Sequence, residues 1–218
     1  VLIRKLLMAL DVVLAVPFVL AARLLRPLVL IRFGGLPSDA IGHLASDMEL
    51  LLCRKDAGWY GRRTIDLFCC ALPVCNQQLK RMWERTVHVS RFALAAERVN
   101  RCLPGGEENR IPFDRAPMDT HGLFISSPPH LTFTPEEQRR GADALRELGV
   151  PEGHPFVCFT ARDNAYYATR PLYQNAPMRH RNSDILTYLP AVEALVQRGY
   201  VAVRMGASVE RPLPLGRS

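Results

Sequence analysis

The chain has 218 residues, of which 48% are hydrophobic and 22% are charged. That apolar content is enough to bury a sizeable core, which excludes a disordered, collagen-like or low-complexity protein. The formal net charge of +7 admits three classes of partner, namely nucleic acid, an anionic membrane surface and a phosphorylated small molecule.

The six cysteines show neither paired Cys-x-x-Cys spacing nor a regular disulfide pattern. We therefore expect reduced, mostly buried thiols in a protein that faces the cytosol. The sequence predicts no metal site and no bound cofactor.

The amino end, residues 1–27, contains a nearly unbroken apolar run from Leu6 to Ala22. A membrane-spanning helix needs about 20 apolar residues, and Asp11 and Pro17 interrupt this run. Cations flank it on both sides, so no orientation across a bilayer is indicated. Residues 1–27 are predicted to be either a membrane anchor or a core helix, with the anchor favoured. A cleaved signal peptide, whose general pattern the segment matches, is a further alternative.

Residues 28–133 are expected to form a first Rossmann-like domain. Leu28–Phe33 is predicted to be a buried strand, followed by a glycine-containing loop and a helix with apolar residues at helical spacing. Further strands are predicted at Thr64–Cys70 and in the Thr-Val-His-Val run, with helices after each. Strands that alternate with helices are typical of a parallel, doubly wound sheet.

His43 lies where the first loop meets its helix. Loops at the carboxyl edge of such a sheet bind ligands, so the imidazole is a candidate general base. The alternative is that His43 caps or packs against the start of the helix. The glycine-containing loop that leads to His43 has neither the Gly-x-Gly-x-x-Gly pattern nor the pattern of a Walker loop.

Residues 104–135 are rich in proline and glycine and predict a connecting region, so a second domain is expected over residues 134–218. Thr134, Pro135 and Glu137 form a capping-box pattern at the start of a helix that stops at Gly149. A strand is predicted at Pro155–Ala161. Beyond a long loop, the sequence predicts a helix capped by Ser183 with Pro190 inside it, a stop at Gly199, and a strand over Tyr200–Met205.

This second domain is a predicted strand-crossover-strand unit whose two parallel strands end at the same edge. Arg162 and Asp163 follow the first strand, and Arg204 and Gly206 end the second. The loop between them contributes further cationic residues: Arg170, Arg179, His180 and Arg181. Arginines beside a glycine turn suit a diphosphate, while the alternative is a solvated basic loop.

Three stretches of the chain carry a resemblance: "AIGHLASDMELLL", "VCFTARDNAYY" and "RNSDILTYLPAVEALVQRGYVAVRMG". Together they look like a bacterial family of predicted glycosyltransferases associated with cell-surface polysaccharide gene clusters. The resemblance implies a GT-B-like α/β fold with two facing Rossmann-like domains, the first for the acceptor and the second for a nucleotide-sugar donor. We expect the second to be incomplete here, because such a domain needs more strands after Gly206.

The chain is similar, more distantly, to fucosyltransferase-type enzymes, in which an arginine after the first donor-domain strand contacts the donor diphosphate. Arg162 occupies the matching place, whereas Thr160 stands where those enzymes often carry a histidine. The resemblance thus implies a donor diphosphate contact for Arg162, at the sheet edge where the residue pattern already predicts an anion site. The expected members of the whole site are Arg162, Arg181, Arg204 and Gly206 for the diphosphate, and Tyr166, Ser183 and Asp184 for the base or sugar.

The expected function is transfer of a sugar from a nucleotide-sugar to a cell-surface glycan or lipid-linked acceptor, with His43 or Asp163 as the base. The expected location is the cytoplasmic face of the bacterial inner membrane, with the membrane surface as a partner. The alternative is a nonenzymatic, membrane-associated basic module. Nucleic acid is not expected as a partner, because the basic residues are dispersed and no recognition motif is present.

Overall fold

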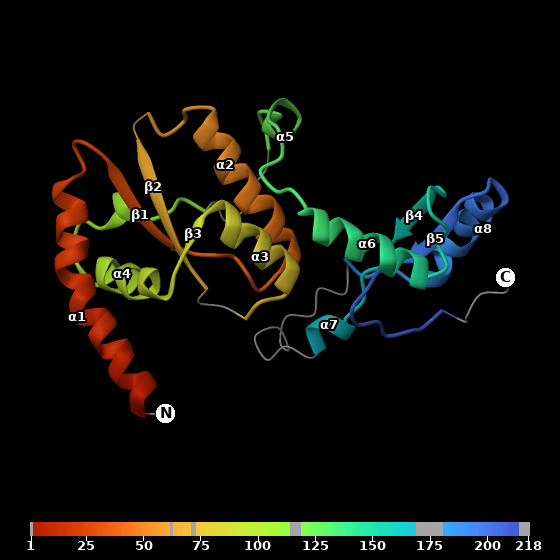
Figure 1. The fold of residues 1–218 in the computed structure, drawn as a ribbon, viewed down its shortest axis with the longest axis horizontal. Coiled ribbons are helices and arrows are strands. Elements are labelled where there is room, and N and C mark those ends of the chain that lie inside the picture. Colours follow the sequence, from red (N-terminus) through yellow and green to blue (C-terminus); the bar gives the residue numbers. More distant parts are fainter. Residues whose placement is uncertain (1, 62, 71–72, 114–118, 169–180, 214–218) are drawn as a thin grey trace. The chain divides into compact units, whose positions relative to one another are not determined.

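The structure is a computed structural model that describes residues 2–61, 63–70, 73–113, 119–168 and 181–213. Within these residues the protein is mixed α/β with parallel strand pairing, as the alternation of strands and helices predicted. The chain divides into two compact units, Val1–Phe133 (unit 1) and Thr134–Ser218 (unit 2) (Figure 1).

Unit 1 contains a parallel sheet in the order β1-β2-β3, with Leu30 paired to Thr64 and Leu67 to His88. In chain order its principal elements are α1 (Leu2–Leu24), β1 (Leu30–Gly35), α2 (Met48–Asp56), β2 (Thr64–Cys69), α3 (Gln77–Thr86), β3 (His88–Val89), α4 (Arg91–Cys102) and α5 (Leu123–Ser126). A one-turn π-helix, η1 (His43–Asp47), precedes α2, and a short 3₁₀ turn, η2 (Glu107–Asn109), follows α4.

Helices cover both faces of this sheet. Successive residues of a strand point to opposite faces, so Leu67 faces the α1 and α4 side while Phe68 faces the side of α2 and α3. On the first side the core consists of Ala15, Val19, Ala22, Phe33, Ala95, Ala96 and Val99. On the second it consists of Leu36, Leu44, Met48, Leu51, Leu52, Phe68, Trp83 and Ile111.

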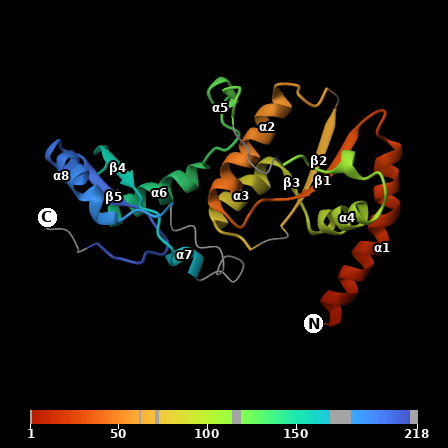
Figure 2. The same ribbon diagram turned by 180° about the vertical axis from the view of Figure 1, so that it is seen from behind.

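The apolar amino-terminal segment is a helix packed into unit 1. Ala15 and Val19 of α1 are fully buried against α4 and β1, and the two helices lie side by side in Figures 1 and 2. Arg23 donates hydrogen bonds to the carbonyl oxygens of Leu103 and Pro104 at 3.1 and 2.7 Å, which ties α1 to the end of α4. None of the described helices is long and apolar enough to cross a bilayer.

The first strand begins two residues later than the sequence predicted. Leu28 and Val29 donate backbone hydrogen bonds to the carbonyl oxygen of Leu25 at 2.9 Å, so a turn after α1 extends into the expected strand. Leu28 is consequently exposed, and β1 runs from Leu30 to Gly35.

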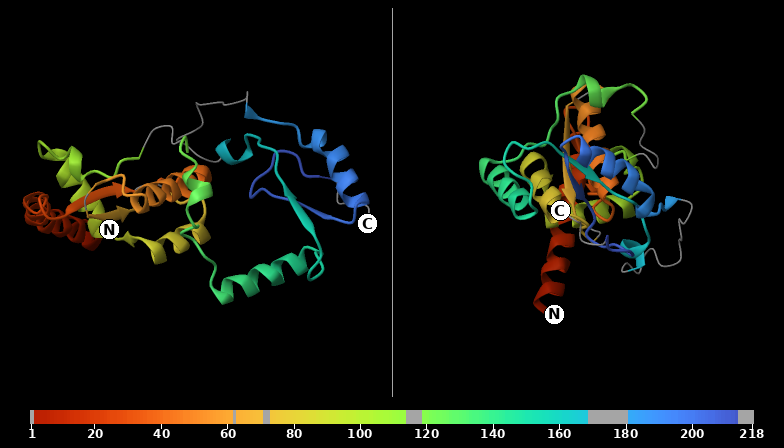
Figure 3. Two further views of the ribbon diagram at one scale, coloured as in Figure 1. Left: turned by 90° about the horizontal axis from the view of Figure 1, so that it is seen from above. Right: turned by 90° about the vertical axis from the view of Figure 1, so that its right-hand side faces the viewer.

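Unit 2 contains two parallel strands, β4 (Phe156–Phe159) and β5 (Val201–Arg204), paired from Phe156 with Val201 to Phe159 with Arg204. The predicted strand-crossover-strand unit is therefore confirmed (Figure 3). Among the described residues of unit 2, the helical elements are α6 (Pro135–Glu147), α7 (Ala165–Ala168), the 3₁₀ turn η5 (Ile185–Tyr188) and α8 (Leu189–Gln197).

The ends of the unit 2 helices follow their sequence signals with one exception. The capping box at Thr134 and Glu137 is present, and Gly149 adopts φ 83°, a left-handed conformation that suits glycine at a helix end. The predicted Ser183 cap is wrong by one residue. Asp184 is the cap, because its carboxylate accepts the backbone N–H of Leu186 at 3.0 Å. The 3₁₀ turn η5 ends at Tyr188, and α8 begins at Leu189 with Pro190 in its first turn.

Candidate functional site

The imidazole of His43 stands at the carboxyl edge of the unit 1 sheet. β1 ends at Gly35, and the loop after it leads into η1, whose first residue is His43. Loops that follow parallel strands form the ligand-binding edge of α/β sheets. The structure therefore places His43 at the loop-to-helix junction that the sequence indicated.

His43 is paired with a buried carboxylate. Its Nδ1 lies 2.9 Å from Oδ2 of Asp47, one helical turn away, and the two side chains are 56% and 7% exposed. Ser46 Oγ donates to the carbonyl oxygen of Gly42 at 2.6 Å and lies 3.2 Å from the other carboxylate oxygen of Asp47. A carboxylate on Nδ1 favours the tautomer that keeps Nε2 free to accept a proton, as a general base requires.

One contact from α3 holds this turn in place, and a second bond joins the loops that precede it and follow β2. The indole Nε1 of Trp83, on α3, donates to the carbonyl oxygen of Leu44 at 2.7 Å, and both residues are fully buried. In the loop after β1, the carbonyl oxygen of Ser38 accepts the backbone N–H of Cys75 at 2.8 Å. The loops after β1 and β2 are thereby joined beside the His43 turn.

In unit 2 the backbone brings three predicted site residues to one sheet edge. The N–H of Met205, next to Arg204, donates to the carbonyl oxygen of Phe159 at 2.8 Å, and the N–H of Ser183 donates to that of Arg162 at 2.9 Å. Arg162, Ser183 and Arg204 therefore belong to adjoining segments at the carboxyl ends of β4 and β5. This grouping follows from the parallel pairing.

The segment after β5, residues 207–213, returns across this edge and is called the return segment below. Its Glu210 N–H donates to Oδ2 of Asp163 at 2.9 Å, and the carbonyl oxygen of Arg211 accepts Nη1 of Arg204 at 2.6 Å. Arg211 also lies 3.5 Å from Oδ1 of Asp184. Three of the predicted donor-site or catalytic residues thus contact this segment.

Asp163 has a structural role in this arrangement. Its Oδ1 accepts the N–H of Ala165 at 2.9 Å while its Oδ2 accepts that of Glu210, so both oxygens order the loop. Gly206 makes the turn into the return segment at φ 152°, and an added Cβ would meet Val209 Cγ1 at 3.0 Å. The geometry therefore favours His43 over Asp163 as a base, and it explains the glycine by the turn.

The remaining predicted residues of the unit 2 site are located here only by their position along the chain. Tyr166 lies in α7, directly after the Asp163 loop, and Arg181 lies just before Ser183, where the chain re-enters the described part. Arg170, Arg179 and His180 of the predicted basic loop lie outside the described residues.

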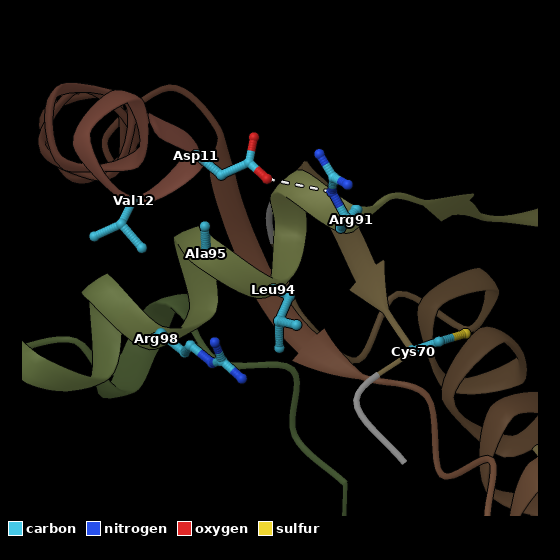
Figure 4. Close-up of a pocket in the computed structure, with 7 residues that line it drawn as sticks. All are labelled: Asp11, Val12, Cys70, Arg91, Leu94, Ala95 and Arg98. Carbon is cyan, nitrogen blue, oxygen red and sulfur yellow. Dashed lines mark ion pairs between the residues drawn. The ribbon is translucent and has the colours of Figure 1, made fainter. Parts of the chain in front are cut away.

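A cleft of about 240 Å³ lies between α1 and α4. Asp11 and Arg91 point toward one another at its rim, with Asp11 Oδ2 and Arg91 Nε 3.3 Å apart (Figure 4). Arg98 projects from the same helix beside Leu94 (Figure 4). The cleft combines two guanidinium groups with an apolar lining, and the sequence predicted none of these residues as a site.

Sequence reasoning missed two further groupings, the His43–Asp47 pair and a cluster that includes His130. The pairing with Asp47 could have been predicted, because a carboxylate four residues after His43 lies on the same helical face. Glu49, Cys53 and His130 converge on one another, with ligand-type atoms all within 4.8 Å. The sequence separation between α2 and His130 left no local signal for this cluster.

Comparison with known proteins found no match to the chain among family models, curated proteins or solved structures.

Proposed function

We propose that the protein is a glycosyltransferase that moves a sugar from a nucleotide-sugar to a glycan or lipid-linked acceptor. In this proposal unit 1 activates the acceptor hydroxyl and unit 2 holds the donor, as in a GT-B enzyme. The proposal rests on the sequence resemblance together with the side-chain geometry at the two sheet edges.

The observation that carries the proposal is the pairing of His43 with Asp47. An exposed imidazole with Nε2 free and Nδ1 bonded to a buried carboxylate is arranged to take a proton from a hydroxyl. As the imidazole gains positive charge, Asp47 stabilises it. Proton removal of this kind contributes about 10²–10⁴-fold to a transfer rate.

On the donor side, Arg162 and Arg204 provide positive charge where the leaving diphosphate would develop negative charge. Guanidinium groups match phosphate oxygens in a two-point geometry, and fixed positive charge stabilises a departing anion. Arg204 at present donates to the backbone of the return segment. Donor binding therefore requires either a phosphate beside that bond or displacement of residues 207–213.

Binding of nucleoside diphosphates tests the donor assignment. Calorimetric titration of the full chain with UDP and GDP should detect binding of at least one of them, and Arg162→Ala should weaken it about tenfold or more. Arg139→Ala, which removes an exposed arginine of α6, is the matched control for lost positive charge. Equal affinities in the Arg162 variant and the control would remove Arg162 from the donor site.

A second candidate function, binding to an anionic membrane surface, is favoured by the outward face of α1. The exposed positions of residues 9–28 are all apolar: Ala9, Leu10, Val12, Val13, Leu14, Val16, Pro17, Leu20, Ala21, Leu24, Leu25, Pro27 and Leu28. The charged residues of this stretch instead face the protein, where Asp11 pairs with Arg91 and Arg26 binds Asn109. Exposed apolar patches of this extent mark interaction surfaces.

Positively charged side chains beside this face of α1 suit lipids with negatively charged headgroups. Arg91 and Arg98 of α4 are exposed and line the cleft next to Val12 of α1. Cations at the rim of an apolar helix face are typical of helices that lie in the plane of a bilayer surface. Such binding would hold the protein at the cytoplasmic face of the inner membrane, the location expected from the resemblance.

Sedimentation with lipid vesicles tests this second function. Vesicles of phosphatidylcholine with phosphatidylglycerol should retain the protein, and Val13→Glu with Leu20→Glu should reduce the bound fraction about tenfold or more, because carboxylates enter the apolar layer poorly. Ile125→Glu is the matched control, since Ile125 is 93% exposed in α5, away from this face. Equal retention of all three proteins would exclude α1 as the contact surface.

A further inference from the structure

Two metal-ligand side chains lie on one face of α2. Glu49 and Cys53 are four residues apart, and this spacing places side chains one above the other on a helix. His130, from the segment after α5, lies against the same face, with its Nδ1 3.0 Å from Oε1 of Glu49. A carboxylate, a thiol and an imidazole thus converge from two distant parts of unit 1.

The separations and the burial are those of a compact coordination site. One ligand atom from each of Glu49, Cys53 and His130 lies within 4.8 Å of the other two. Cys53 is 1% exposed, and the side chains of His130 and Glu49 are 16% and 20% exposed. Zinc binds sulfur, nitrogen and oxygen at about 2.0–2.3 Å, so small movements of these side chains would bring all three into one coordination sphere.

His130 is also oriented from its other nitrogen. Its Nε2 lies 3.0 Å from Oδ2 of Asp56, a third residue on the same face of α2. Metal-binding histidines usually donate the second ring N–H to a carboxylate, which fixes the ring and increases its basicity. The backbone N–H of His130 also donates to Oε1 of Glu49 at 3.0 Å, so both main chain and ring are positioned.

From this arrangement we propose that Glu49, Cys53 and His130 bind a zinc ion, with Asp56 orienting the histidine. On binding, zinc displaces the thiol proton of Cys53 and any proton on Nδ1 of His130, and both protons go to solvent. Three protein ligands leave one tetrahedral position for water or another small ligand. The zinc site is independent of the proposed transferase activity, because none of its residues belongs to the acceptor or donor assignments.

Carboxylates face the imidazole from both sides. Oε1 of Glu49 lies 3.0 Å from Nδ1 of His130, and Oδ2 of Asp56 lies 3.0 Å from Nε2 of the same ring. A divalent ion bound between Glu49, Cys53 and His130 would provide positive charge beside these two carboxylates.

Bound metal would also connect two segments of the fold. His130 precedes Leu131, which packs against the core that α2 shares with α3. The zinc ligands therefore come from α2 and from a segment that contacts the same core. A ligand that binds only the folded state stabilises it, so zinc should raise the unfolding temperature of the chain.

Cobalt provides a direct probe of this site, because Co²⁺ replaces zinc and a cobalt–thiolate bond absorbs strongly in the near ultraviolet. Titration of the reduced full chain with Co²⁺ should produce this band at one equivalent, and added Zn²⁺ should abolish it. Cys53→Ser should remove the band. The control Cys102→Ser, which alters an exposed cysteine in α4, should leave it unchanged.

A second variant separates metal loss from misfolding. His130→Gln retains Cys53 but removes a ligand, and it should weaken zinc affinity at least about tenfold while the protein keeps its native circular dichroism. Zinc should raise the unfolding temperature of the wild-type chain and not that of this variant. A band that persists in Cys53→Ser, or a wild-type chain that binds no cobalt, would overturn the proposal.

Discussion

Arg32 of β1 and Asp66 of β2 form a buried two-point ion pair at directly paired positions of the unit 1 sheet. Arg32 Nε and Nη2 lie 2.6 and 3.0 Å from the two carboxylate oxygens, and the side chains are 2% and 4% exposed. The ring of Tyr60 stacks over the guanidinium at 4.0 Å, and Lys55 contacts Asp66 at 3.2 Å. Every charge of this buried group therefore has a partner.

Because both charges are removed from water, loss of one partner should be costly. Asp66→Asn leaves the Arg32 guanidinium buried without its counter-charge, and we expect the free energy of unfolding to fall by about 3–5 kcal/mol. Urea denaturation followed by circular dichroism measures this change.

The matched control is Lys55→Met, which removes only the partly exposed cation of the group and should cost less than about 1 kcal/mol. The double variant Arg32→Met with Asp66→Leu removes both charges and should recover much of the lost stability. If Asp66→Asn unfolds at the same urea concentration as wild type, the pair does not contribute as described.

The capping box of α6 should contribute measurably to unit 2. Thr134 Oγ1 accepts the N–H of Glu137 at 3.2 Å, and Glu137 Oε2 accepts that of Thr134 at 2.9 Å. Thr134→Ala removes the first bond and should lower stability by about 1 kcal/mol. Thr132→Ala, two residues earlier at an exposed position, should have a smaller effect in the same denaturation measurement. Identical shifts for the two variants would argue against the cap.

The Cys69 thiol should resist alkylation. Burial raises its pKa to about 11, and the negative charges of Glu97 and Cys70 contribute in the same direction. Because the thiolate is the reactive form, only about one Cys69 in a thousand is ionised at pH 8. Raising the pH toward 11 increases that fraction, so the labelling rate should rise with pH.

Peptide mapping after iodoacetamide treatment at pH 8 checks this prediction. The exposed Cys102 should be modified well before Cys69 in the folded protein, and the difference should disappear in denaturant. Equal labelling rates in the folded state would contradict the burial of Cys69.

The elements of both units were largely predictable from local patterns. Hydrophobic spacing, the Thr134 capping box and the glycine stops each act within a few residues of sequence, and helices and strands followed them. The apolar run at the amino end was ambiguous, because leucine and valine suit both lipid and a protein core. The small residues Ala15 and Ala22, together with Val19, provide the close contact with α4 that distinguishes the packed helix.

Contacts between distant residues were not predictable in the same way. Arg32 looked like part of a buried strand, yet its partner Asp66 is specified only by the strand register. The return segment over Asp163 and the approach of His130 to Glu49 likewise depend on tertiary folding. The sequence thus predicted that His43 follows the loop after β1 and that Arg204 ends a strand parallel to β4, whereas the bonding partners of these residues emerged only from the structure.

The most direct test of the central proposal is nucleotide-sugar turnover by the full chain. Release of nucleoside diphosphate from a panel of UDP- and GDP-sugars, with saccharide acceptors, should be detectable for one donor, and His43→Gln should reduce it about 10²–10⁴-fold. Asp47→Asn should cause an intermediate loss with little change in KM, while His88→Gln, an exposed histidine in β3, should leave turnover unchanged. Turnover that is equal in wild type and His43→Gln, or no turnover with any donor of the panel, would contradict the proposal.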